Sequence, residues 1–341
     1  MPIDLLLRFL AEPADLTMLS EPGCWSAVKK SANRLGVATL AAHAARAGLQ
    51  PEDRLWCDRI LASSWSRHEK SLHNLGAVLA LLEAEEIVPM ALKGPMLACR
   101  YYDPPFLRRP SGDLDLAVRR EDLDRASAAM VRAGYKLRMP VAAAKLRSHH
   151  VELSHPDRQS VELHFNLSHG AFGIPVDEFF DRAIPCEMPG GRTVLVPDPA
   201  DEIMQLALHF VHSSDITLFH LCEIRRIWMA ATPGVRQDAV NRAAMHHFAG
   251  VFTVLDIAIG ARWGETLLPP EIRREKTWLH ARLNGAFYAA FERRFLDGRA
   301  PLSMATRLSR KWLLLQMTDR PIDALRLAFI SARTALLQFP G

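Results

Sequence analysis

Two aspartates, Asp113 and Asp115, are separated by one residue in the apolar run Asp113-Leu114-Asp115-Leu116. Successive side chains of a strand point to opposite faces, so both carboxylates are expected on one face and both leucines on the other. Like charges held this close repel each other unless a cation lies between them. Because carboxylate oxygens suit Mg²⁺, the spacing predicts a divalent-cation site.

A third carboxylate is expected from the alternating run 160–165, Ser-Val-Glu-Leu-His-Phe. A similar run at 149–154 precedes it across a turn-rich link, which predicts a β-hairpin. Glu162 and His164 then share a polar face, and polar groups that face a domain interior need partners. Glu162 is the expected third carboxylate, with Glu152 on the neighbouring strand as its substitute if Glu162 points elsewhere. His164 suits a structural hydrogen bond as well as a place in the site.

The turn Lys93-Gly94-Pro95 follows the apolar run 87–92 and indicates a phosphate site. Glycine permits a tight turn and proline suits the first turn of a helix. The free N–H groups at the start of such a helix attract anions. The residues expected to bind nucleotide are Lys93, Gly94, Arg108, Arg109, Ser111 and His164. A plain turn and solvent-exposed arginines remain the alternative interpretation.

Together these groups favour phosphoryl or nucleotidyl transfer, in which metal ions neutralise phosphate charge and align an in-line attack. Asp113, Asp115 and Glu162 are the expected catalytic and metal-binding residues, for one or two Mg²⁺ ions or for Mn²⁺ in their place. Glu162 would bind a second metal ion or accept the proton of the attacking hydroxyl. The expected donor is a nucleoside triphosphate, with ATP first, and the leaving group is pyrophosphate.

The composition, 49% hydrophobic and 23% charged, is that of an ordinary globular protein. A net charge of +4 is too small to diagnose nucleic-acid binding. No aromatic-basic RNA motif is evident, which favours a small-molecule or peptide or protein acceptor over RNA. Five scattered cysteines argue for reduced thiols. The sequence lacks a signal-like leader and a long apolar run, so we expect a cytoplasmic protein without a membrane partner.

The hydrophobic pattern predicts an α/β (α+β) protein in three parts. These are an N-terminal helical segment at 1–85, a mixed α/β domain at 86–198 and a C-terminal helical domain at 199–341. Helices are expected at 25–47, 51–82 (with a break), 95–102, 120–134, 200–213, 219–230, 236–260, 277–296 and 321–338. Beyond the strands already named, short strands are expected at 135–139 and 193–196, the latter within an otherwise irregular segment at 167–200.

The run LKGPMLACRYYDPPFLRRPSGDLDLAV and the later VELHFNL resemble a little-characterised nucleotidyltransferase family of the DNA polymerase β superfamily. That family's pattern is LKG, then RPxxDxD, then a strand with ELH, and the resemblance covers residues 70–170. It implies a mixed sheet flanked by helices, with 86–198 as the catalytic domain, Asp113 and Asp115 as metal ligands and Glu162 as the third carboxylate. The wider superfamily has Gly-Ser where this chain has Lys93-Gly94-Pro95, so the charge of Lys93 would replace a serine hydroxyl.

The leading hypothesis is a magnesium-dependent nucleotidyltransferase that moves a nucleoside monophosphate to a hydroxyl group. A non-catalytic nucleotide-binding or interaction module that kept the fold is the alternative, although such a module would not need all three carboxylates. A metal-dependent phosphoester hydrolase would use the same carboxylates with water as acceptor. Release of orthophosphate instead of pyrophosphate would identify it.

Overall fold

The computed structural model describes residues 6–7, 10, 23–168, 174–212 and 217–268. They form two compact units. The sheet unit holds the described residues of Ala38–His169 and Gly173–Glu202, and the helical unit holds those of Met1–Val37 and Ile203–Gly341. The helices expected at 277–296 and 321–338 lie outside the described residues. No helix in the described part of the chain is both long and apolar enough to cross a membrane.

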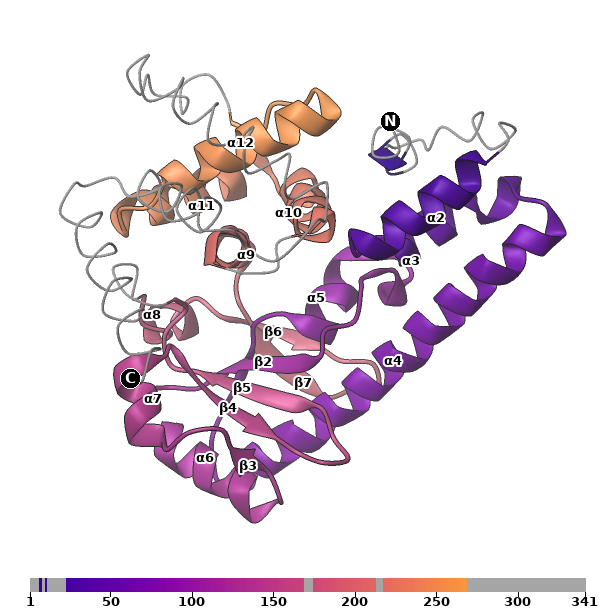
Figure 1. Ribbon diagram of the computed structural model, residues 1–341. Helices are drawn as coiled ribbons and strands as arrows, with labels where there is room; N and C mark the ends of the chain where they lie inside the picture. Colours follow the sequence, from indigo (N-terminus) through magenta and orange to yellow (C-terminus); the bar gives the residue numbers. More distant parts are fainter. Residues whose placement is uncertain (1–5, 8–9, 11–22, 169–173, 213–216, 269–341) are drawn as a thin grey trace, which may run out of the picture. The chain divides into compact units, whose positions relative to one another are not determined.

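A seven-stranded mixed sheet lies at the centre of the sheet unit, in the order β3-β4-β5-β2-β1-β7-β6 (Figure 1). Its strands are β1 (Met90–Ala91), β2 (Asp113–Ala117), β3 (Lys136–Leu137), β4 (His150–Ser154), β5 (Ser160–His164), β6 (Ile184–Glu187) and β7 (Thr193–Val196). The β2–β5 and β1–β7 pairs are parallel and the other pairs are antiparallel. The predicted mixed sheet with flanking helices is therefore confirmed.

The helices divide between the two units. The sheet unit contains α3 (Ala38–Ala45), α4 (Pro51–Glu83), α5 (Gly94–Tyr101), α6 (Leu123–Arg132), α7 (Val141–Arg147) and α8 (Asp177–Phe180), with the 3₁₀ turns η2 (Arg46–Gly48) and η3 (Pro105–Leu107). The helical unit contains α2 (Cys24–Arg34), α10 (Leu218–Ala230), α11 (Pro233–Met245), α12 (Gly250–Trp263) and most of α9 (Pro199–His212).

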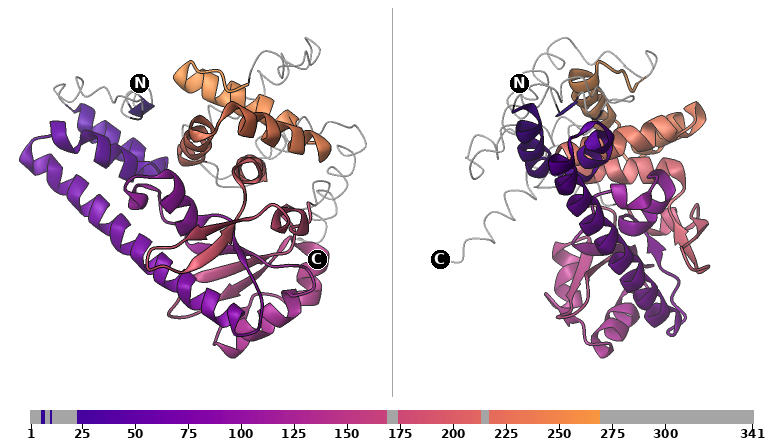
Figure 2. Two further views of the ribbon diagram at one scale, coloured as in Figure 1. Left: turned by 180° about the vertical axis from the view of Figure 1, so that it is seen from behind. Right: turned by 90° about the vertical axis from the view of Figure 1, so that its right-hand side faces the viewer.

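The expected break in the helix at 51–82 is wrong: α4 is unbroken over 33 residues and is one continuous rod in both views of Figure 2. Pro51 at its first position and acidic residues in its first turn suit a helix N-terminus. Leu72, Leu75 and Leu79 in its second half are buried in one cluster with the strands. The domain boundary expected at residue 85 stays a prediction, but α4 packs on the sheet and belongs to the sheet unit.

The sheet has one apolar face, as the alternating sequence predicts. Its buried strand residues include Leu114, Leu116, Val151, Leu153, Val161 and Leu163. They pack with α4 and with the apolar stripe of α6, to which Leu123 and Met130 belong. The polar residues of β2, β4 and β5 alternate with these and must point to the opposite face. That face carries the candidate site.

Two expected helices are each divided in the structure. The segment 25–47 forms α2 and α3, separated at Gly36, whose φ is +76°. The segment 236–260 belongs to α11 and α12, separated at His247, whose φ is +62°. A residue in the left-handed conformation ends a helix. Neither break was predicted, because both lie in runs whose apolar spacing continues across them.

The connecting segments hold more regular structure than predicted. The expected strand 87–92 contains only the two residues of β1. The segment 167–200 contains α8 and β6 besides the predicted β7. β6 and β7 form an antiparallel hairpin whose turn includes Gly190 and Gly191, with φ of +96° and +84°. Helix α7 was not predicted either.

We predict that Leu75→Ala lowers the free energy of unfolding by about 2–5 kcal/mol, because it leaves a cavity in the core. Leu75 is 1% exposed among the residues that join α4 to the sheet. Leu55→Ala is the matched control, since Leu55 lies on the same helix and is 51% exposed. Urea unfolding of both variants measures the difference. Equal stabilities would contradict the packing of α4 on the sheet.

Candidate active site

The parallel pairing of β2 with β5 places Asp115 directly opposite Glu162 and Asp113 opposite Ser160. Opposed residues share a face of the sheet, so Glu162 lies beside Asp115 as the sequence predicted. Glu152, the substitute, lies opposite Glu162 on β4, and its carboxylate forms an ion pair with Arg138 at 2.6 Å. The geometry therefore favours Glu162 over Glu152 as the third carboxylate.

His164 holds Asp115 and Glu162 together. Its Nε2 lies 3.1 Å from Oδ1 of Asp115 and 3.3 Å from Oε2 of Glu162. One ligand atom from each of these three residues lies within 4.8 Å of the other two. Burial lowers the pKa of His164, but its hydrogen bonds to both carboxylates outweigh burial and raise that pKa. The imidazole therefore favours its protonated form between two negative charges.

Lys93 forms a buried ion pair with Asp115. The Leu92 N–H donates to the Asp115 carbonyl at 3.1 Å, which brings the next residue beside the aspartate. Lys93 Nζ lies 2.9 Å from Asp115 Oδ1, and the two side chains are 12% and 6% exposed. Burial raises the pKa of Asp115, but Lys93 and then His164 outweigh burial and hold that pKa well below its usual range. The sequence predicts that Lys93 binds phosphate, and in the structure Lys93 neutralises a carboxylate.

Asp113 lies on the same face of the sheet, two residues before Asp115. Of the three carboxylates, that of Asp113 has its negative charge neutralised least. Ser111 Oγ donates to its carbonyl at 2.8 Å, and Gln159 Nε2 donates to the carbonyls of Ser111 and Asp113 at 3.0 Å each. These bonds fix the backbone and leave the carboxylate without an ion-pair partner among the described residues. Burial, with repulsion from Asp115 and Glu162, raises the pKa of Asp113 to about 6.

Asp115 and Glu162 lie close enough, with His164, to hold one divalent cation, whereas no ligand atom of Asp113 belongs to that group. Asp113, Asp115 and Glu162 offer oxygen donors from adjacent strands, the ligand type that Mg²⁺ prefers. Because burial first, and then repulsion from Asp115 and Glu162, raises the pKa of Asp113, a cation bound nearby would favour its ionised form. A nitrogen donor from His164 would extend the donor set towards Mn²⁺.

We predict that Asp113→Asn stabilises the metal-free protein above about pH 6 and not below about pH 4. A carboxyl whose pKa is about 6 when folded and about 3.9 when unfolded holds its proton more tightly in the folded state. That stability is present at low pH and is lost as pH rises through this window. The amide avoids the loss, which is on the order of 2 kcal/mol.

Urea unfolding in EDTA across this pH range measures the effect. Asp157→Asn is the control, because Asp157 is exposed. A stability difference between Asp113→Asn and the unaltered protein that does not vary with pH would contradict the electrostatic account.

Gly94 opens α5 with φ +67°, a conformation that favours glycine. A Cβ at this position would meet Ser111 Oγ at 3.8 Å, an ordinary contact. The dihedral, and not crowding, therefore requires glycine here. The free N–H groups at the start of α5 directly follow Lys93 in the chain, as predicted. The nucleotide-binding roles of Lys93 and Gly94 stay predictions.

Arg108 and Arg109 directly follow η3 in the chain. Arg108 is buried, and its Nη1 donates to the Arg109 carbonyl at 3.4 Å. It also lies near His68 of α4, whose pKa is lowered by burial and by Arg108. Arg109 is half-buried. The expected roles of both arginines in binding nucleotide also stay predictions.

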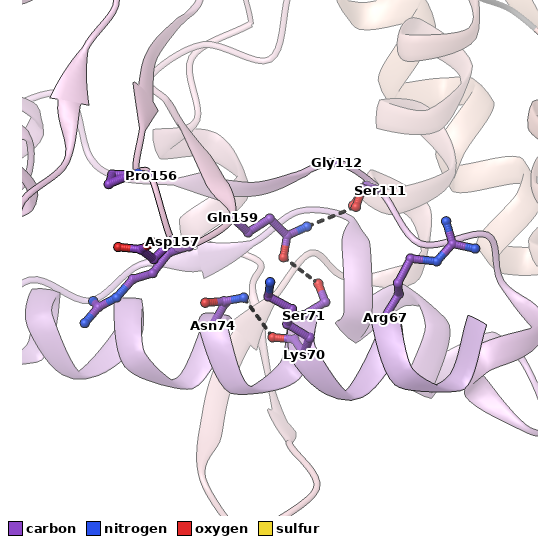
Figure 3. Close-up of a pocket in the computed structure, with 10 residues that line it drawn as sticks. Arg67, Lys70, Ser71, Asn74, Ser111, Gly112, Pro156, Asp157 and Gln159 are labelled. Carbon is purple, nitrogen blue, oxygen red and sulfur yellow. Dashed lines mark hydrogen bonds between the residues drawn. The ribbon is translucent and has the colours of Figure 1, made fainter. Parts of the chain in front are cut away.

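A cavity of about 520 Å³ opens next to the start of β2, between α4 and the β4–β5 turn (Figure 3). Its lining consists of Arg67, Lys70, Ser71, Asn74, Ser111, Gly112, Pro156, Asp157, Arg158 and Gln159. Figure 3 shows Gln159 between α4 and Ser111, and Ser71 Oγ donates to Gln159 Oε1 at 3.0 Å. Three of the lining residues, Arg67, Lys70 and Arg158, are basic and one, Asp157, is acidic.

Sequence reasoning missed several residues around the site. Gln159 gave no signal, because its contacts depend on how α4 meets the sheet. His149 and His150 were read only as the start of a strand. The register of β4 with β5 places His150 opposite His164. The adjacent histidines in an alternating run were the available signal.

Residues 21–253 match a protein family described as uncharacterised nucleotidyltransferase. The match confirms the family resemblance of the LKG, RPxxDxD and ELH motifs and extends beyond residues 70–170. No curated protein matches the sequence.

Two solved structures are similar to parts of the chain. The antibiotic-resistance factor ANT(2'')-Ia aligns with a TM-score of 0.40 at 11% identity, over 51% of this chain and 92% of that one. The lincosamide antibiotic adenylyltransferase LnuA, solved with lincomycin, aligns with a TM-score of 0.30 at 16% identity, over 46% and 94%.

Proposed function

The chain belongs to the family of uncharacterised nucleotidyltransferases, and we propose that Asp113, Asp115 and Glu162 form its active site. The proposed reaction moves a nucleoside monophosphate from a nucleoside triphosphate to a hydroxyl group and releases pyrophosphate. The observation that supports it best is the β2–β5 register, which places Glu162 beside Asp115 on the polar face of the sheet. We assign the catalytic domain to 86–198, between N-terminal and C-terminal helical parts.

Asp113, Asp115 and Glu162 would hold Mg²⁺, or Mn²⁺ in its place. The bound cation would neutralise the phosphate oxygens and align the attack. Lys93 lies where α5 begins, so an ammonium released from Asp115 can turn to the triphosphate. Glu162, which contacts His164, would bind a second metal ion or accept the proton of the attacking hydroxyl. Arg108, Arg109 and Ser111 complete the proposed nucleotide site.

We propose a small molecule, or a peptide or protein side chain, as the acceptor and ATP as the donor. The cavity beside Asp113 supports a small acceptor, because about 520 Å³ lies in the usual range of small-ligand sites. Arg67, Lys70 and Arg158 favour an acceptor that carries an anionic group. A cytoplasmic location stays a prediction.

A turnover screen tests the proposal. The protein is incubated with Mg²⁺ and each of the four nucleoside triphosphates over a panel of hydroxyl-bearing small molecules and peptides, and pyrophosphate and orthophosphate are measured separately. We expect pyrophosphate release that depends on an acceptor and is absent from an Asp113→Asn/Asp115→Asn variant.

Orthophosphate release without an acceptor would overturn transfer in favour of hydrolysis. Equal binding of metal–nucleotide by the protein and the double variant, with no turnover by either, would overturn the catalytic assignment in favour of a binding module. Mn²⁺ in place of Mg²⁺ is run beside each reaction, because His164 lies within reach of the cation.

A further inference from the structure

Three histidines form a second cluster on the polar face, beside the carboxylates. His149 and His150 begin β4, and His150 lies opposite His164 of β5. One ring nitrogen from each of the three lies within 4.8 Å of those of the other two. The ring centroids are 4.4 to 5.3 Å apart. Three imidazoles this close are a donor set that Mg²⁺ does not favour and Zn²⁺ does.

The distances between these donors are close to those of a tetrahedral zinc site. Two ligands at about 2.0–2.1 Å from a tetrahedral Zn²⁺ lie roughly 3.3 Å from each other. His149 Nε2 and His150 Nδ1 are 3.2 Å apart. Glu162 Oε2 lies 3.6 Å from His150 Nδ1 and 3.3 Å from His164 Nε2. The ring nitrogens of the three histidines, all within 4.8 Å of one another, would have to move closer together to surround one ion.

A metal ion would displace the proton that the two carboxylates favour on His164, because a metal ligand must be a neutral imidazole. His164 is 4% exposed, and its Nδ1 is buried without a hydrogen-bond partner in the part of the chain that the structure describes. A buried nitrogen without a partner is costly, and a ligand removes that cost.

We propose that His149, His150 and His164 bind Zn²⁺ beside the proposed Mg²⁺ site, with His164 at the border of the two. Glu162 lies between the two sites, with its carboxylate near His150 and His164 on one side and opposite Asp115 on the other. Such a carboxylate can bridge two cations. The two sites would differ in the metal ion that they prefer: nitrogen donors favour Zn²⁺ and oxygen donors favour Mg²⁺.

The test is a metal titration of the full chain after chelation, with no nucleotide present. Zn²⁺ is titrated against a chromophoric chelator in excess Mg²⁺, and Co²⁺ is added separately as a spectroscopic probe. We expect one tight Zn²⁺ equivalent that Mg²⁺ does not displace, and the visible absorption of tetrahedral Co²⁺. Displacement by Mg²⁺, or an octahedral Co²⁺ spectrum, would overturn the proposal.

Variants locate the site. His149→Gln and His150→Gln are each expected to weaken Zn²⁺ binding by at least roughly 100-fold, since even the loss of a group that only orients a ligand costs about 10–100-fold. His73→Gln is the matched control, because His73 is exposed on α4. Unchanged binding by His149→Gln and His150→Gln would overturn the proposal. The Co²⁺ spectrum is read on the unaltered protein, so a variant that fails to fold does not remove the test.

Asp113→Asn separates this proposal from the proposed function. It is expected to abolish nucleotidyl transfer and to keep the Zn²⁺ equivalent, because Asp113 is not one of the three histidines or their carboxylate neighbour. Zinc binding without any transferase activity would leave the histidine site standing and the proposed reaction refuted. Nucleotidyl transfer without zinc binding would support the proposed reaction and refute the histidine site.

Discussion

We expect Asp115→Asn to lower the rate of nucleotidyl transfer by roughly 10³-fold, because it would remove a charge that is proposed to hold the cation against the phosphates. A bound metal ion stabilises the transition state by several kcal/mol, and each 1.36 kcal/mol is about tenfold in rate. Glu162→Gln is expected to have an effect of similar size, since Glu162 lies opposite Asp115 and shares the contact with His164. Initial rates of pyrophosphate release at saturating nucleotide measure both.

Glu152→Gln is the matched control for these variants. Glu152 lies in the same row of the sheet, one strand beyond Glu162, and its partner is the exposed Arg138. Its amide variant is expected to keep the rate within a few-fold. A loss at Glu152 as large as that at Glu162 would mean that general damage to the sheet, and not the loss of a ligand, explains the result.

Lys93→Met destabilises the metal-free protein by about 3–5 kcal/mol, and Mg²⁺ restores part of that loss. Removing one partner of a buried ion pair leaves the other charge uncompensated. Lys93 and Asp115 are such a pair, and of the residues that the structure describes, His164 is the one left to neutralise the aspartate. A cation bound to Asp115 takes the place of the ammonium, so the variant should gain more stability from Mg²⁺ than the unaltered protein does. Thermal unfolding in EDTA and in Mg²⁺ measures both gains.

Lys145→Met provides the comparison, because the Lys145–Asp124 pair lies at 2.7 Å with the Asp124 side chain 67% exposed. A pair of this kind contributes about 1 kcal/mol at most. Its loss should be small and independent of Mg²⁺. If Mg²⁺ does not rescue Lys93→Met, then Asp115 does not bind the cation in the folded protein.

The part of the site that could be predicted depends on strand alternation. The period of two places Asp113 and Asp115 on one face, and the same period places Glu162 and His164 on one face of β5. Alternation is a local pattern in the sequence, so it can be recognised without knowledge of the fold. It also distinguished the apolar face, where Leu114 and Leu116 pack.

The remainder depends on contacts between distant segments, which no local pattern specifies. The Lys93–Asp115 pair requires the β1–β2 register, in which Ala91 lies opposite Leu116. The contact of Ser71 with Gln159 joins residues 88 positions apart. The histidine cluster requires the register of β4 with β5. The helix breaks were missed for the opposite reason, since one backbone angle at Gly36 or His247 outweighs an apolar pattern that continues across it.

The parallel register of β2 with β5 makes the site depend on chain length as well as on residue identity. Deleting one residue inside β5 would exchange its two faces, so that Val161 and Leu163 would replace Glu162 and His164 beside the aspartates. An added residue in the exposed turn at Pro156–Arg158 would extend into solvent and leave the strand register unchanged. The number of residues within each of the two strands is therefore fixed, whereas the number of residues in the segment between them can vary.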